Sequence, residues 1–84
     1  MANIAWIYCD FRPYALHQGL EIMREDMNFI EKIVSKIPIT YQRKALKAYV
    51  QIWMQELETH KDNAIGKQNL GRRAANSYLR EQVE

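Results

Sequence analysis

The sequence predicts an all-α protein with a long antiparallel helical hairpin, a short carboxy-terminal helix and an aromatic amino-terminal arm. One domain, residues 1–84, is expected from a chain of 84 residues. Only three glycines and two prolines interrupt the chain, which favours long helices with short connections. Apolar residues also recur at alternating steps of four and three, the heptad spacing of a helix whose narrow apolar seam faces another helix. The seam consists of Leu16, Leu20, Met23, Met27, Ile30, Val34 and Ile37.

The arm is expected over residues 1–12. Trp6 and Tyr8 alternate with other apolar residues as in a short strand, but no second segment is suited to pair with it. We therefore expect a hydrophobic arm lying on the helices, or a short first helix. Asp10 suits a cap or turn, and Pro13 suits the first turn of a helix.

The first long helix is predicted over residues 13–37, along the heptad seam. Ile22, Phe29 and Ile33 widen its apolar face, and charged residues occupy most of the opposite face. The helix should end at Ile37, because a proline at position 38 disfavours helical geometry in the preceding residue.

A second helix is predicted over residues 40–61 and a third over residues 69–83. The second continues the heptad spacing, with Trp53 on its seam, and Thr40 can cap it. Two matched seams joined by a tight turn predict an antiparallel hairpin of the first two helices. Ala74 and Ala75 are small enough to let the third helix approach that hairpin closely.

Composition argues against several function classes. The only cysteine, Cys9, rules out an internal disulfide and is expected to be a buried small hydrophobe, and two histidines are too few for the common structural zinc sites. No apolar run is long enough to cross a bilayer, so a cytoplasmic protein is expected. Without a phosphate loop or a nucleophile with a neighbouring base, we expect no enzyme, cofactor or metal.

Basic residues are the first candidates for a binding function. The net charge is only +2, but residues 41–84 carry eight basic and five acidic side chains. This half could contact the phosphate backbone of DNA or RNA, although a solvated basic face is the alternative. The candidate nucleic-acid-binding residues are Arg43, Lys44, Lys47, Lys67, Arg72, Arg73 and Arg80.

Aromatic residues near the amino terminus are the second candidates. One small domain does not easily cover four of them, so we expect an interface with a protein partner or with a second copy in a homodimer. The candidate interface residues are Trp6, Tyr8, Phe11 and Tyr14.

A segment of the second half carries a family resemblance. Ile37-Pro38 precedes a basic amphipathic helix, and the run Gly71-Arg72-Arg73-Ala74-Ala75-Asn76-Ser77-Tyr78-Leu79-Arg80-Glu81 follows. Residues 37–84 thereby resemble a segment in the amino-terminal region of replication initiator endonucleases of temperate tailed phages. The chain has no His-x-His pair of their nicking domain. The resemblance implies an accessory or docking role in phage-type DNA replication, without nicking.

The expected function is therefore non-catalytic: an interaction module, from a phage or mobile element, that binds a host or phage protein. The alternative is a small DNA-binding regulator or replication accessory protein that uses the basic second half. The two functions predict different surfaces. An interaction module should expose aromatic side chains, whereas a DNA-binding protein should gather its basic residues on one face.

Overall fold

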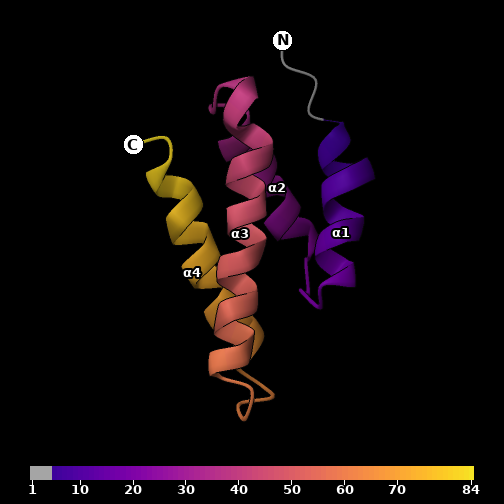
Figure 1. Ribbon diagram of the computed structural model, residues 1–84, viewed down its shortest axis with the longest axis vertical. Coiled ribbons are helices and arrows are strands. Elements are labelled where there is room, and N and C mark those ends of the chain that lie inside the picture. The colour runs from indigo at the N-terminus through magenta and orange to yellow at the C-terminus, as the bar shows by residue number, and fades with distance from the viewer. Residues whose placement is uncertain (1–4) are drawn as a thin grey trace.

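A computed structural model describes residues 5–84, and every regular element within them is a helix (Figure 1). The prediction of an all-α fold is confirmed. None of the helices in this part of the chain is long and apolar enough to cross a membrane. The elements are the π-helical turn η1 (Ile7–Phe11) and the helices α1 (Arg12–His17), α2 (Arg24–Val34), α3 (Ile39–Thr59) and α4 (Lys67–Glu81).

The amino-terminal segment is helical, so a short first helix, the second of the two expected alternatives, replaces the arm expected over residues 1–12. Residues 1–4 lie outside the described part. Trp6, Phe11 and Arg12 all have right-handed helical dihedrals, so η1 and α1 form one continuous helix. Pro13 explains the wider turn. It has no backbone N–H, and its ring would clash with the carbonyl of Cys9 in a regular α-helix. The Arg12 N–H instead donates to the Ile7 carbonyl, five residues back.

The single helix predicted over residues 13–37 is wrong, because residues 18–23 divide it into α1 and α2. Gly19 has φ +94°, a left-handed conformation that glycine adopts without steric cost and that ends a helix. Met23 is extended, and α2 then runs back along α1 (Figure 1). The break leaves Leu16 and Met23 exposed, at 42% and 53%, although the other seam residues are buried.

The turn between α2 and α3 lies at Ile37-Pro38, as predicted, but Pro38 rather than Thr40 is the residue preceding α3. Gln42 closes this turn. Its buried side-chain amide donates to the carbonyls of Val34 (3.1 Å) and Ile37 (3.0 Å), at the carboxy-terminal end of α2. The Val34 carbonyl also accepts the N–H of Ile37 at 2.9 Å. The amide thus joins the end of α2 to the residue before Pro38 and stabilises the point at which the chain reverses.

The long antiparallel hairpin is formed by α3 and α4, which pack along most of their length (Figure 1). The prediction had placed it between residues 13–37 and 40–61. Small residues of α4 permit the approach: Ala75 is fully buried, and Gly71 lies against the indole of Trp53. Trp53 is fully buried, as predicted, beside the fully buried ring of Tyr49 at 5.9 Å between ring centroids.

Candidate protein-interaction groove

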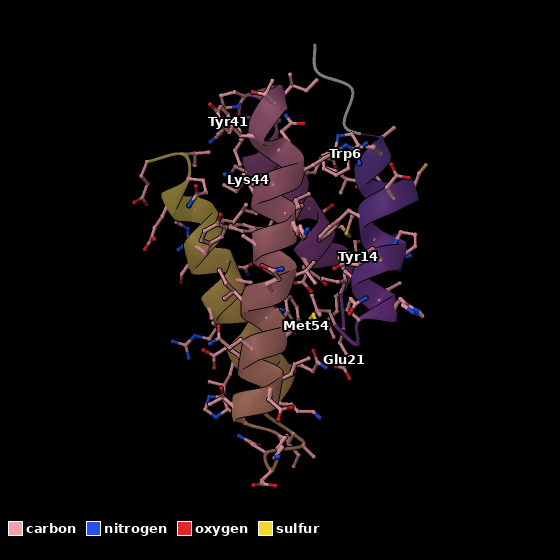
Figure 2. The ribbon with its side chains drawn as sticks, in the orientation of Figure 1. Trp6, Tyr14, Glu21, Tyr41, Lys44 and Met54 are labelled. Carbon is pink, nitrogen blue, oxygen red and sulfur yellow. The ribbon has the colours of Figure 1, made fainter. Side chains whose placement is uncertain are left out.

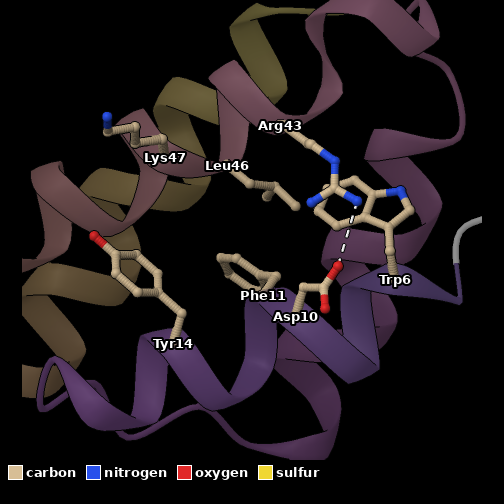
Figure 3. A pocket seen from close by; sticks show the side chains of 7 residues that line it. All are labelled: Trp6, Asp10, Phe11, Tyr14, Arg43, Leu46 and Lys47. Carbon is tan, nitrogen blue, oxygen red and sulfur yellow. Dashed lines mark hydrogen bonds and ion pairs between the residues drawn. The ribbon is translucent and has the colours of Figure 1, made fainter.

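A groove of about 360 Å³ lies between the η1–α1 helix and the first turns of α3 (Figure 3). We call it the α1–α3 groove. Positions four residues apart lie on one helix face, so the spacing of Trp6, Asp10 and Tyr14 places all three on its wall. The lining residues are Trp6, Asp10, Phe11, Tyr14, Arg43, Leu46 and Lys47.

The opposite wall is basic. Arg43 and Lys47 lie one helical turn apart on α3, and the buried side chain of Leu46 lies between them in sequence. The Arg43 guanidinium stacks on the indole of Trp6, 4.3 Å from the ring centroid, and an oxygen of Asp10 lies 3.3 Å from one of its nitrogens (Figure 3). The groove therefore combines aromatic surface with two cations and one carboxylate.

The ion pair in the groove is exchangeable. The Arg43 and Asp10 side chains are 65% and 59% exposed, and pairs of this kind contribute about 0–1 kcal/mol to stability. The side chain of Lys47 makes no ion pair or hydrogen bond within residues 5–84. A carboxylate from another molecule could take the place of Asp10 beside Arg43, and could pair with Lys47 directly.

Three of the four candidate interface residues line this groove. Trp6 is half-buried and Tyr14 is 42% exposed, and both project toward α3 (Figure 2). Phe11 is 5% exposed and packs edge-on against Tyr49, so it forms the base of the groove.

Tyr8 lies elsewhere, on the side of η1 that faces α2. Its hydroxyl donates to Glu31 at 2.6 Å. The pKa of Tyr8 is raised, chiefly because that hydrogen bond favours the protonated hydroxyl, with smaller contributions from desolvation and from the charge of Glu31.

The candidate basic residues do not gather on one face. Arg43 and Lys47 face α1, whereas Lys44 lies on the other side of α3, in a separate pocket with Tyr41 and Tyr78 (Figure 2). On α4, the Arg80 guanidinium lies over Phe29 of α2, 5.6 Å from its centroid. Lys67 is half-buried and Arg73 is exposed.

Arg72 is a structural residue. Its Nε lies 2.7 Å from Asp26, its Nη2 donates to the carbonyl of Glu21 at 2.8 Å, and its guanidinium lies 5.0 Å from the Trp53 centroid. The Arg72 and Asp26 side chains are only 18% and 4% exposed. Most of this guanidinium is therefore engaged in contacts between α4 and α2.

Sequence reasoning missed two lining residues and misjudged a third residue nearby. Asp10 was expected to be a cap or turn residue, and Leu46 was not among the candidate site residues, but both line the groove. The four-residue spacing of Trp6, Asp10 and Tyr14 indicates a shared helix face, but only if residues 6–14 are expected to be helical. Cys9, expected to be buried, is exposed.

No potential metal site of three or more histidine, cysteine or carboxylate side chains occurs within residues 5–84. Comparisons with protein families, with curated proteins and with solved structures found no match to this chain.

Proposed function

We propose that the chain is a non-catalytic protein-interaction module, and that the α1–α3 groove binds an acidic segment of a partner protein carrying one bulky apolar side chain. The observation that carries the proposal is the Arg43 guanidinium stacked on Trp6 in a groove shared with Tyr14 and Lys47. Tryptophan, tyrosine and arginine are the residues most enriched where alanine substitution costs an interface most.

The charge of the groove supports an acidic partner. Two cations and one carboxylate line the groove, so its net charge is positive, and neither cation is deeply buried. An incoming carboxylate would gain a partner in Lys47 and could replace the weakly held Asp10. The apolar side chain of the segment would cover Trp6 and Tyr14 above the base formed by Phe11.

The biological setting is part of the proposal. The resemblance of residues 37–84 to phage replication initiators predicts a phage or host protein as the partner, and a cytoplasmic accessory role. A homodimer, in which a second copy fills the groove, remains the competing mode of association.

Selection from a random peptide display library tests the proposal. We expect enrichment of peptides that combine aspartate or glutamate with one aromatic or large aliphatic residue. Lys47→Glu should weaken the best of them at least about tenfold, because like charges would then face each other across the contact. Arg73→Glu, at an exposed position of α4, is the matched control and should leave affinity unchanged.

The proposal fails if no such peptides are enriched, or if both charge reversals weaken binding equally. Size-exclusion chromatography with light scattering separates the competing functions. A dimer that Lys47→Glu dissociates would mean that a second copy occupies the groove. A salt-sensitive shift with duplex DNA that Arg73→Glu abolishes would favour the DNA-binding regulator instead.

A further inference from the structure

A second groove, also of about 360 Å³, lies on another side of the η1–α1 helix, where it faces α2. We call it the α1–α2 groove. Tyr8 and Arg12 are one helical turn apart on one wall, and Arg24 and Asn28 are one turn apart on the other. Because α2 returns antiparallel to α1, the hydrogen bond from Tyr8 to Glu31 joins the walls at one end (Figure 1). Met27 completes the lining.

The two arginines of this groove have no counter-charge. Neither the Arg12 nor the Arg24 guanidinium forms an ion pair or side-chain hydrogen bond within residues 5–84, and no carboxylate lines the groove. Both side chains are exposed at its rim. Two guanidinium groups flanking one hollow repel each other weakly, and an anion between them would relieve that repulsion.

Glu25, next to Arg24 in sequence, neither lines the groove nor forms an ion pair within residues 5–84, and two other carboxylates of α2 are engaged elsewhere. One oxygen of Glu31 accepts the Tyr8 hydroxyl, and the two oxygens of Asp26 accept the Met23 N–H (2.9 Å) and Arg72 Nε (2.7 Å). No carboxylate therefore pairs directly with either arginine within residues 5–84.

The donors suit a tetrahedral oxyanion. An arginine presents paired N–H groups in a planar fork that matches two oxygens of a phosphate. Asn28 supplies an amide on the same face of α2, and Arg24 is the first residue of that helix, where the helix dipole favours negative charge.

The volume exceeds what a bare oxyanion needs, since a water molecule takes about 30 Å³ of liquid. The side chain of Met27, only 3% exposed, provides an apolar base beside the ring of Tyr8. We infer that the α1–α2 groove binds a phosphate monoester, with Arg12 and Arg24 on the phosphoryl oxygens and the organic part against Met27 and Tyr8. This site is separate from the α1–α3 groove and does not depend on the proposed function.

Amide NMR titration of the isotopically labelled protein tests the site, at constant ionic strength in a chloride background. The probes are inorganic phosphate and phenyl phosphate. We expect saturable shifts at amides of α1 and α2, with tighter binding of phenyl phosphate. Arg12→Gln and Arg24→Gln should each weaken it at least about tenfold, because each removes charged hydrogen bonds. Arg73→Gln is the matched control and should bind as the wild type does.

Three results would overturn the inference. Shifts that rise linearly without saturating would indicate general ionic effects, and equal weakening by Arg73→Gln would indicate non-specific attraction to basic side chains. Phenyl phosphate binding no more tightly than inorganic phosphate would refute the ester assignment. Lys47→Glu should leave the titration unchanged, which separates this site from the α1–α3 groove. Because the substituted arginines are exposed, all variants should keep the wild-type circular dichroism spectrum.

Discussion

Gly71→Ala tests the closest approach of α4 to α3. An ideal Cβ at position 71 would lie 2.4 Å from Cδ1 of Trp53 and 2.8 Å from its Nε1. The indole cannot move aside freely, because it is fully buried and its Nε1 donates to Gln68 at 2.8 Å. The substitution must therefore displace either the ring or the helix.

The change in the free energy of unfolding is the sum of two destabilising contributions and one stabilising contribution. Overpacking a core by one methyl costs about 1–3 kcal/mol. Loss of the hydrogen bond from Trp53 to Gln68 adds about 1 kcal/mol. Alanine is intrinsically about 1 kcal/mol better than glycine inside a helix. We expect Gly71→Ala to lower the free energy of unfolding by about 1–3 kcal/mol.

Urea unfolding followed by circular dichroism measures this change as a lower transition midpoint with an unchanged m-value. Ser77→Gly and Ser77→Ala, at an exposed position of the same helix, measure the intrinsic difference between glycine and alanine without a clash. A Gly71→Ala protein as stable as the wild type, or more stable, would refute the packing of Gly71 on Trp53.

Two further predictions concern the buried polar groups. Asp26→Asn should lower the free energy of unfolding by about 3 kcal/mol in thermal or urea denaturation, because it leaves the Arg72 cation without its carboxylate. Glu25→Gln, at an exposed neighbouring position, should change that free energy by less than about 0.5 kcal/mol. Equal losses in the two variants would contradict a stabilising ion pair between Asp26 and Arg72. Burial raises the pKa of Tyr49, with a further contribution from the charge of Asp26 that Arg72 partly opposes. The folded protein then retains a proton that an unfolded tyrosine loses near pH about 10, so stability should fall as pH rises above that value. As pH rises, the tyrosinate absorbance of Tyr49 should appear together with unfolding. Ionisation of Tyr49 in the folded state would contradict the prediction.

The sequence predicted the helical class and much of the core because those features depend on local spacing. Trp53 and the turn at Pro38 follow from patterns within a few residues. The single helix over residues 13–37 was wrong because the heptad spacing continues across Gly19, where the backbone reverses. Gly19 could have indicated a helix end, but the heptad spacing on both sides of it favoured a continuous helix.

The candidate site was less predictable because its residues are assembled by long-range packing. The ion pair of Arg72, one of the candidate nucleic-acid-binding residues, could not be predicted, because its partner Asp26 lies 46 positions earlier in the chain. Trp6 and Arg43 were assigned to different candidate surfaces, although they stack on each other. Only the docking of η1–α1 on α3 places them together, and no local pattern encodes that docking.

The bonds of Gln68 set an order of events during synthesis. Its side chain accepts the N–H of Glu21 and donates to the carbonyl of Gly19, while Arg72 also bonds the carbonyl of Glu21. Residues 18–23 thus depend on partners in α4 that are translated 47 to 51 positions later. The local bonds of Gly19 and Leu20 to α1 can form early, but these three bonds to α4 form only after α4 has left the ribosome, so the reversal between α1 and α2 gains its last hydrogen bonds at the end of synthesis.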